Sequence, residues 1–422
     1  MTYKNTLEFA LQQDKEDALN SYREKFYFPQ MHGREVVYFT GNSLGLQPKS
    51  TQDAILNELE DWATFGVEGH FHARNPWLSY HEQFAKPLAK IVGANPTEII
   101  VMNQLTVNLH LLMVSFYRPT KTRYKILCEA KAFPSDQYAL TSQIKFHGLN
   151  PDDAIIEVSP REGEHCIRHE DVLKAIEENK NSLALILIGG VNYYNGQVFD
   201  MKAITEAGHK AGAVVGFDLA HAAGNLKLQL HDWNVDFACW CSYKYLNSGP
   251  GGVSGVFIHE NNLNNPETIR FAGWWGHDKN SRFKMEKEFV PMPTAEAWQM
   301  SNAPVLSMAA HKAAVAIFDE VGMDALTKKS EKLTGYLEFV LDEINQSLLQ
   351  KLEIITPRDK KQRGCQLSII AHGRGKELFN KITQAGVIAD WREPNVIRVA
   401  PVPLYNSFED VFRFGEILKN NL

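Results

Sequence analysis

Long apolar runs are absent from this sequence of 422 residues. Even residues 183–188 fall far short of the ~20 residues that an apolar helix needs to cross a bilayer. The first residues, MTYKNTLEFA, lead into the charged segment DKED without the apolar stretch of a signal peptide. We therefore expect a cytoplasmic protein with no membrane partner.

Cysteine is also scarce, and its pattern argues against a disulfide framework. The residues concerned are Cys128, Cys166, Cys239, Cys241 and Cys365. They are odd in number, scattered and mostly inside apolar stretches, as expected for reduced thiols in a core. Cys239 and Cys241 form only a C-x-C pair, and no second pair completes a zinc site. We predict no metal site.

An excess of positive charge is missing as well. Lys and Arg number 44 against 50 Asp and Glu, which gives a net charge of −6. No basic field is therefore available to hold a polyanion, and we exclude nucleic acid as a partner. Apolar residues at 44% and charged residues at 22% match ordinary globular proteins and argue against disorder or coiled-coil rods.

The chain contains no internal repeat and no low-complexity tract, so compact domains are expected. The length favours two or three domains, and we begin with two. Between residues 99 and 259, β-rich runs alternate with helical patterns. These runs are IIVM, KILCE, AIIEV, LALILIGG, AVVGFD, VDFACWC and VSGVFIH. The pattern predicts an α/β domain with a mostly parallel seven-stranded sheet, because runs such as LALILI are apolar on both faces.

The segments around this sheet are predicted to be different in kind. Helices are expected over residues 5–25, 48–66, 303–320 and 324–348, before the β-rich runs CQLSIIA and VIRVA. We predict three parts. These are an N-terminal arm (1–47) that joins the small domain, a large α/β domain (48–300) and a small C-terminal α+β domain (301–422).

The segment 213–252 is the most informative part of the sequence. The run AVVGF places Asp218 at its carboxyl end, where open α/β sheets bind ligands, and VDFACWC is followed by Ser242, Tyr243 and Lys244. A lysine in a mostly apolar pocket becomes a nucleophile toward aldehydes. Pyridoxal 5′-phosphate (PLP) needs such a lysine, a carboxylate for its pyridine nitrogen and a cradle for its phosphate. Alone, Asp218 could cap a helix and Lys244 could be a surface charge, but their combination favours the cofactor.

Two predicted helix starts could hold the phosphate, since free N–H groups at a helix start attract anions. Thr106 lies where the apolar pattern of NQLTVNLHLLM begins, and Ser135 and Asp136 lie at capping positions in FPSDQYA. An ordinary helix cap would explain Thr106 equally well.

Several motifs make the chain resemble the kynureninase family. They are GNSLGLQP (41–48), NQLTVNLHLLM (103–113), FPSD (133–136), NYYNGQ (192–197), GFDLAHAAGN (216–225), DFACWCSYKYLN (236–247), GWWGH (273–277) and IRVAPVPLYNSF (397–408). The resemblance covers nearly the whole chain, and the spacing of FDLAH and CWCSYKYLN is its most specific feature. It implies a fold type I PLP enzyme.

The resemblance assigns roles residue by residue. It makes Lys244 the lysine that bonds the cofactor and Asp218 the partner of the pyridine nitrogen. The other cofactor positions are Leu105, Thr106, Phe133, Ser135, Asp136, His221, Tyr243, Trp274 and Asn302. Phe133 would stack on the ring, while Trp274 and Asn302 would reach in from the second subunit of a homodimer. A family position that can be Ser is Gly189 here, so that contact is not carried over.

The expected substrate contacts are Arg398, His70, Asn302, Ser43 and Trp275. Ser43 could instead be an ordinary turn residue, and Trp275 an ordinary core aromatic. Arg398 in VIRVAP lies among apolar residues, where a bidentate carboxylate would satisfy its guanidinium. The resemblance assigns it the substrate α-carboxylate, and the alternative is an edge-strand arginine paired with Asp390 or Glu393. His70 matches a histidine at the aryl end of the family's pocket. The cluster of His70, His72 and His81 could also suggest a metal site. That interpretation is the weaker one, because the HExxH spacing is absent.

The resemblance implies hydrolysis of L-kynurenine or 3-hydroxy-L-kynurenine to an anthranilate and L-alanine. The freed Lys244 would move the α-proton, and Tyr243 is the candidate proton donor and phosphate-side partner. Two alternatives remain. Another fold type I enzyme, such as a cysteine desulfurase or aminotransferase, would share Asp218 and Lys244, although a desulfurase needs a reactive loop cysteine. A non-catalytic binding protein is the other.

Overall fold

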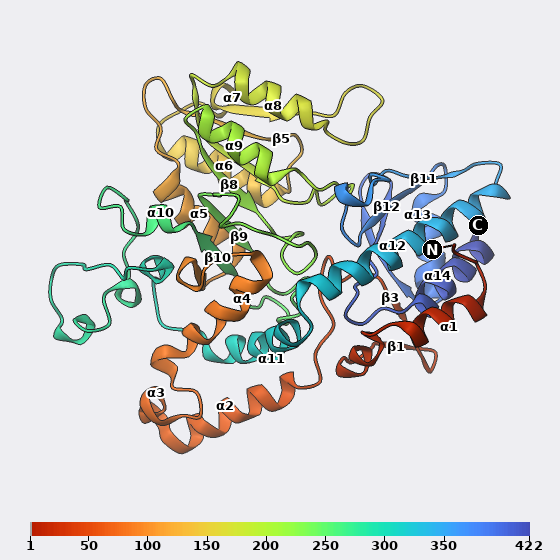
Figure 1. The fold of residues 1–422 in the computed structure, drawn as a ribbon, viewed down its shortest axis with the longest axis horizontal. Helices are drawn as coiled ribbons and strands as arrows, with labels where there is room; N and C mark the ends of the chain where they lie inside the picture. Colours follow the sequence, from red (N-terminus) through yellow and green to blue (C-terminus); the bar gives the residue numbers. More distant parts are fainter. Residues whose placement is uncertain (1) are drawn as a thin grey trace.

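Two lobes make up the computed structural model, which describes residues 2–422 (Figure 1). The helix α12 (Met323–Gln346) runs from the larger lobe into the smaller one, where both chain ends lie. The other α-helices are α1 (Leu7–Glu16), α2 (Thr51–Phe65), α3 (Gly69–His72), α4 (Ala85–Val92), α5 (Leu105–Phe116), α6 (Pro134–Phe146), α7 (Pro151–Ala154), α8 (His169–Glu178), α9 (Met201–Lys210), α10 (Glu260–Leu263), α11 (Val305–Val321), α13 (Gly375–Gln384) and α14 (Phe408–Asn421). Short 3₁₀ turns include η1 (Asn20–Lys25), η5 (Trp274–Gly276) and η7 (Ala295–Trp298).

A seven-stranded sheet forms the centre of the larger lobe, with strand order β4-β10-β9-β8-β7-β5-β6. Its strands are β4 (Ile99–Val101), β5 (Lys125–Glu129), β6 (Ile155–Val158), β7 (Leu183–Gly189), β8 (Val214–Asp218), β9 (Phe237–Trp240) and β10 (Gly255–Ile258). The strands from β9 to β6 run parallel, whereas β10 is antiparallel to β9 and β4. Each of the seven predicted runs is a strand, which confirms the predicted sheet.

Helices cover the sheet, and this explains the continuous apolar runs of its central strands. Strand β7 is buried along most of its length, and β8 and β9 are buried almost throughout. The crossover helix α9 is capped at its start by Asp200, whose carboxylate accepts the backbone N–H of Ala203 at 3.0 Å. Asp200 thus fixes the start of the crossover helix that follows β7. The strands joined by such crossovers run parallel, so their carboxyl ends lie at the same edge of the sheet.

The smaller lobe is built on a four-stranded antiparallel sheet of order β11-β12-β15-β14. Its strands are β11 (Leu352–Ile354), β12 (Leu367–Ala371), β14 (Asp390–Arg392) and β15 (Val396–Val399). A separate parallel pair joins β13 (Val387–Ile388) to β3 (Val37–Tyr38), and β1 (Gln30–Met31) pairs with β2 (Arg34–Glu35). The apolar core of this lobe combines α12, α13 and α14 with residues of α1 and β3.

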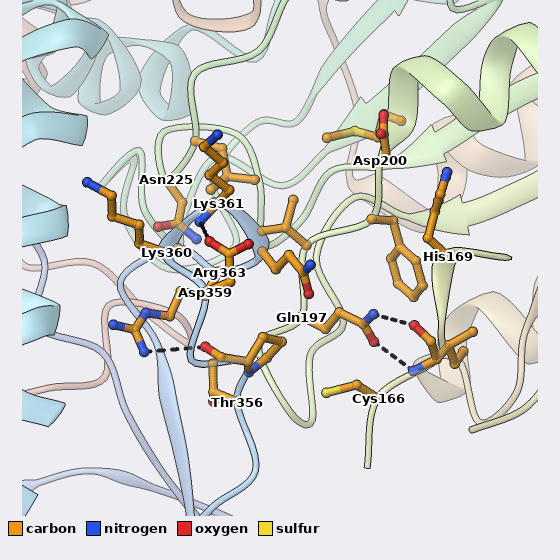
Figure 2. Close-up of a pocket in the computed structure, with 18 of the residues that line it drawn as sticks. Cys166, His169, Gln197, Asp200, Asn225, Thr356, Asp359, Lys360, Lys361 and Arg363 are labelled. Atoms are coloured by element: carbon orange, nitrogen blue, oxygen red, sulfur yellow. Dashed lines mark hydrogen bonds between the residues drawn. The ribbon is translucent and has the colours of Figure 1, made fainter. Parts of the chain in front are cut away.

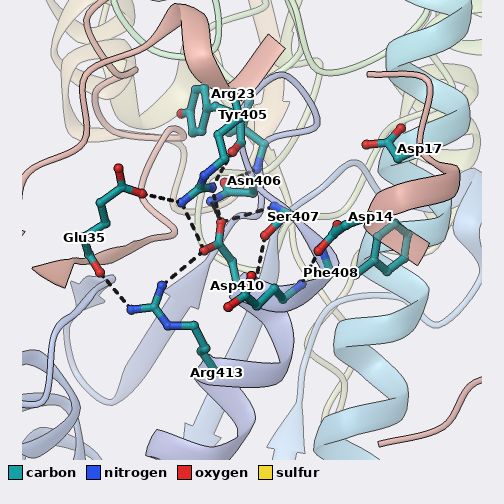
Figure 3. Close-up of polar contacts among 12 residues, drawn as sticks. Asp14, Asp17, Arg23, Glu35, Tyr405, Asn406, Ser407, Phe408, Asp410 and Arg413 are labelled. Carbon is teal, nitrogen blue, oxygen red and sulfur yellow. Dashed lines mark hydrogen bonds and ion pairs between the residues drawn. The ribbon is translucent and has the colours of Figure 1, made fainter. Parts of the chain in front are cut away.

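The N-terminal segment is held to the smaller lobe by a buried polar network (Figure 3). The Asp14 carboxylate accepts the backbone N–H groups of Phe408 at 2.7 Å and Glu409 at 2.9 Å, at the first turn of α14. Arg23 bonds Asp410 at 2.6 Å and also the backbone carbonyl of Tyr405. These contacts attach Asp14 and Arg23 to the first turn of α14, where the free N–H groups of the helix favour a carboxylate.

The predicted helix over 5–25 is wrong in extent: α1 ends at Glu16, because the Asp17 side chain accepts the backbone N–H of Leu19 at 3.0 Å and turns the chain. The division at 47/48 and 300/301 stays a prediction. Helix α11, which follows the second boundary, packs against α2 and α4 of the larger lobe.

Within residues 2–422, every helix is too short or too polar to serve as a membrane span.

Candidate active site

A cavity of about 480 Å³ lies at the carboxyl edge of the seven-stranded sheet. The ends of β5, β7 and β8 and the segment after β9 line it, together with the starts of α5 and α6 and the loop at residues 42–43. The predicted site residues that line it are Ser43, Leu105, Thr106, Phe133, Ser135, Asp136, Asp218, His221, Tyr243 and Lys244. Residues that are far apart in sequence thus meet at one edge of the sheet.

Asp218 and Lys244 meet because their strands are neighbours. Asp218 is the last residue of β8 and lies in register with Cys239 of the parallel strand β9, which leads to Lys244. The Lys244 Nζ atom is 3.1 Å from Nε2 of His221 and 5.9 Å from the centre of the Phe133 ring. One Asp218 oxygen accepts the backbone N–H of Ala220 at 2.7 Å.

Burial sets the charges in this cavity. It raises the pKa of Asp218 above its usual value, raises that of Asp136 well above, and brings the pKa of Glu129 to about 7. Burial, with Lys244 nearby, holds the pKa of His221 well below its usual range. The neutral imidazole can therefore accept a hydrogen bond from Nζ of Lys244 through Nε2.

The two helix starts line the cavity, although the predicted capping positions are wrong. Phe133 is the cap residue of α6 and Pro134 its first residue, so Ser135 and Asp136 lie inside the first turn. Proline suits that position because the first N–H needs no partner within the helix. Gln104, rather than Thr106, precedes α5. Among the described residues, the Gln104 side chain donates or accepts no capping hydrogen bond at this helix start.

Gly45 allows the loop 41–48 to pack against the segment that carries Lys244. Its backbone N–H donates to the Tyr243 carbonyl at 2.9 Å. A Cβ atom at this position would lie 2.4 Å from the Lys244 carbonyl and 2.1 Å from Oδ1 of Asn247. Only glycine permits this approach, which brings Ser43 to the cavity wall.

The remaining predicted residues do not line the cavity. Trp274 is 46% exposed and donates to the Arg282 carbonyl, and Asn302 is also exposed. Trp275 is buried, with its ring against the Arg282 guanidinium. His70 lies on α3, where Nδ1 is 2.9 Å from the Val67 carbonyl.

Arg398 lies on β15, an interior strand of its sheet rather than the edge strand considered above. Its Nη2 is 2.6 Å from Asp390, one of the two partners considered, and its Nη1 donates to the Tyr193 carbonyl at 2.6 Å. The side chain is 1% exposed. Arg398 is therefore an internal arginine close to the cavity.

Sequence reasoning missed other residues that line the cavity, namely Asn42, Gln104, Glu129, Val191, Tyr193, Ala220, Cys241 and Arg392. Two of these residues, Glu129 and Tyr193, could have been predicted from the sequence. Glu129 closes the predicted strand KILCE at the same sheet edge as Asp218, and Tyr193 lies within the motif NYYNGQ. Arg392 carried no such signal, because its place depends on how the smaller lobe meets the larger one.

A second cavity, of about 1000 Å³, lies between the two lobes (Figure 2). Its wall includes Cys166, Gln197 and Asn225 from the larger lobe and Thr356 and Arg363 from the smaller one. Gln197 bridges to the backbone of Ile167, accepting its N–H at 2.9 Å. Within residues 2–422, this wall includes none of the predicted site residues.

All five cysteines are free thiols, and all but Cys166 are buried, which confirms the reduced core thiols that were predicted. Of the three clustered histidines, His81 faces Glu296 at 3.2 Å, and Lys279 already bonds the same carboxylate at 3.0 Å. Lys279 also pairs with Glu82 at 2.8 Å, so both carboxylates beside His81 already have a cationic partner.

Comparison with known proteins identifies the family. Residues 326–418 match the family model described as the kynureninase C-terminal domain. The kynureninase of Flavobacterium psychrophilum is 61% identical over all of this chain and 99% of its own length. That of Myxococcus xanthus is 54% identical over 99% of this chain and 98% of its own. That of Nematostella vectensis is 49% identical over 97% and 93%.

Solved structures agree with the fold. The apo cysteine desulfurase of Thermococcus onnurineus has a TM-score of 0.73 at 18% identity, over 91% of this chain and 94% of that one. A C-DES variant with glycine covalently linked to its PLP cofactor has a TM-score of 0.74 at 15% identity, over 91% and 96%. At such identities these likenesses speak for the fold alone, which is the predicted fold type I. The full-length identities carry the assignment: this chain belongs to the kynureninase family.

Proposed function

We propose that this protein is a PLP-dependent hydrolase that cleaves the Cβ–Cγ bond of L-kynurenine, 3-hydroxy-L-kynurenine or both. The products are anthranilate or 3-hydroxyanthranilate, and L-alanine. The observation that carries the proposal is the meeting of Lys244 and the buried Asp218 in one cavity, in a chain that belongs to the kynureninase family throughout its length.

The cavity fits PLP. Lys244 Nζ is available to an aldehyde, and the Phe133 ring, 39% exposed, offers a flat face beside it. Asp218 supplies a buried carboxylate for a pyridine nitrogen, and the uncapped first turn of α5 supplies N–H groups for a phosphate. When bound, PLP supplies a protonated ring that accepts electrons from the substrate's α-carbon.

The chain's own residues then move protons. Lys244 would remove the substrate's α-proton, and the neutral His221, 3.1 Å from Nζ, would orient the Lys244 amine. Burial raises the pKa of Tyr243 above its usual value, so its hydroxyl stays protonated at neutral pH and is able to donate. Leu105, Thr106, Ser135 and Asp136 hold the cofactor from the helix starts.

Substrate recognition is assigned to groups on both lobes. Arg398 binds the α-carboxylate, because a buried guanidinium with one unsatisfied Nε favours an anionic partner. His70 is assigned to the aryl end of the substrate, and Ser43 and Trp275 are further candidates for contact with it. A preference between the two substrates stays open, and comparing kcat/KM for each of them measures it.

Trp274 and Asn302 are assigned to the active site of a second copy in a homodimer. Both side chains are exposed and lie outside this chain's cavity. An apolar surface on α2 and the residues after it supports an interface. It consists of Leu56, Leu59, Trp62, Phe65, Val67 and Phe71. Mixing inactive Lys244→Ala and Trp274→Ala proteins should restore about a quarter of native activity, since half the dimers are mixed and each has one complete site.

Cysteine desulfurase activity is the less suitable alternative. Cys241 does line the cavity, yet it is buried, and burial raises its pKa above the usual value. A thiol that resists ionisation is a poor nucleophile.

The decisive test combines a spectrum with product detection. The purified protein should absorb visible light, and adding L-kynurenine should release fluorescent anthranilate. Lys244→Ala should carry no covalently attached cofactor after borohydride reduction, as judged by mass spectrometry. Asp218→Ala should lose cofactor on dialysis and nearly all turnover. A wild-type protein that binds PLP but releases sulfur from cysteine, and no anthranilate from kynurenine, would overturn the proposal.

A further inference from the structure

Arg392 is the arginine on the wall of the active-site cavity, whereas Arg398 is buried and is not part of that wall. Arg392 lines the same cavity as Lys244 and Asp218, and its side chain is 34% exposed. Arg398 is 1% exposed, with two of its nitrogens committed to Tyr193 and Asp390. A ligand in the cavity therefore meets Arg392 first.

Asp390 joins the two arginines across neighbouring strands. It lies directly opposite Arg398 in the antiparallel pair of β14 and β15, and Arg392 points to the same face two residues later. The Asp390 carboxylate is 2.6 Å from Nη2 of Arg398, and 3.2 Å from both Nε and Nη2 of Arg392. One carboxylate thus fixes two guanidinium groups.

The cluster is one negative charge short, because two guanidinium groups share the single carboxylate of Asp390. Nε of Arg398 is also buried without a hydrogen-bond partner among the described residues, and Nε of Arg392 has only the ion-pair contact with Asp390, whose geometry is not that of a hydrogen bond. Burying such donors unsatisfied is costly, and an incoming carboxylate would supply the missing charge and acceptors.

We propose that Arg392 is a second binding residue for the substrate's α-carboxylate, and that Asp390 is the positioning residue that holds Arg392 and Arg398 in place for it. The inference rests on the proposed function and deepens it. The carboxylate enters between the two guanidinium groups and takes up the donors that Asp390 leaves free. Substrates that lack this carboxylate gain nothing from Arg392.

The test compares L-kynurenine with its decarboxylated amine, which keeps the aryl ketone and the amine. In Arg392→Gln, KM for L-kynurenine should rise about 10- to 100-fold, the loss expected for a charge-assisted hydrogen bond. The inhibition constant of the amine should stay unchanged. Titration with L-alanine, followed by the absorbance of the bound cofactor, should give the same loss of affinity without turnover.

Three further substitutions test whether the effect belongs to the Arg392 guanidinium held by Asp390. Arg392→Lys keeps the charge but loses the planar fork, so its KM should lie between those of the wild type and Arg392→Gln. In an Asp390→Asn background the effect of Arg392→Gln should shrink, because the two residues act as a unit. Arg161→Gln removes an exposed guanidinium paired with Asp171 and is the charge-matched control, with unchanged KM.

Failure of the inference is distinct from failure of the proposed function. A wild-type protein that releases no anthranilate from kynurenine refutes the function. If the wild type is active, equal changes in the kynurenine KM and the amine inhibition constant, or no change in either, refute the role of Arg392. A selective loss of PLP from Arg392→Gln, with the ratio of the two constants unchanged, would assign the residue to the cofactor and also overturn the inference.

Discussion

Glu129 should make the stability of the cofactor-free protein depend on pH. Its carboxylate ends β5, lines the cavity and lies 3.1 and 3.2 Å from the backbone N–H of Gly189. Burial is the main cause that raises its pKa, and the charge of Asp218 adds to it, while Asp136 is the third carboxyl group of the same cluster. Replacing Glu129 by Gln keeps the shape of the side chain and removes this titration.

The size of the effect follows from the difference in pKa between the folded and unfolded states. The pKa of Glu129 is about 7 in the folded protein, compared with 4.5 for an unperturbed glutamate. Between these values the folded state binds more protons than the unfolded state, so stability falls as pH rises. About 2.5 pKa units correspond to about 3 kcal/mol, or about 4 °C in Tm for a chain of this length.

Thermal unfolding of the cofactor-free wild type and Glu129→Gln from pH 4 to pH 8 measures this difference. The variant should gain Tm relative to the wild type as pH rises through 4.5 to 7, and the gain should level off above pH 7. Asp136 and Asp218 titrate in both proteins, so comparing the two isolates Glu129. Glu157→Gln, at an exposed position on the adjacent strand β6, is the control. A Tm difference that is independent of pH would refute the argument.

Three other predictions concern the loop, the N-terminal segment and the carboxylate site. Gly45→Ala should lower stability by about 1–3 kcal/mol through overpacking and reduce kcat, and unchanged Tm and kcat would contradict it. Asp14→Ala removes two bonds to the start of α14 and should cost about 2 kcal/mol in denaturant titration, with kinetic constants retained. Arg398→Lys should raise KM far more than it changes kcat, because the lysine lacks the fork, and an unchanged KM would remove Arg398 from the site.

The fold was largely predictable because it depends on local patterns. A strand covered on both faces must be apolar throughout, so the run LALILI already indicated a central strand, and it forms most of β7. The helix capping positions were less predictable. Ser135 and Asp136 are residue types that often cap helices, yet the cap residue is Phe133 and the helix already begins at Pro134. Which residue caps a helix depends on the backbone conformation at that one residue, and the amino-acid composition of the segment does not specify it.

The meeting of Asp218 and Lys244 was determined by sequence, because each follows a predicted parallel strand and the carboxyl ends of such strands share one edge. The places of Glu129 and Arg392 were decided by tertiary structure. Glu129 faces Gly189 across the sheet, and Arg392 reaches the cavity only when the smaller lobe packs against the larger one. Local sequence encodes the pattern of burial along an element. Contacts between elements far apart in the chain depend on how those elements pack, and only the folded chain fixes that packing.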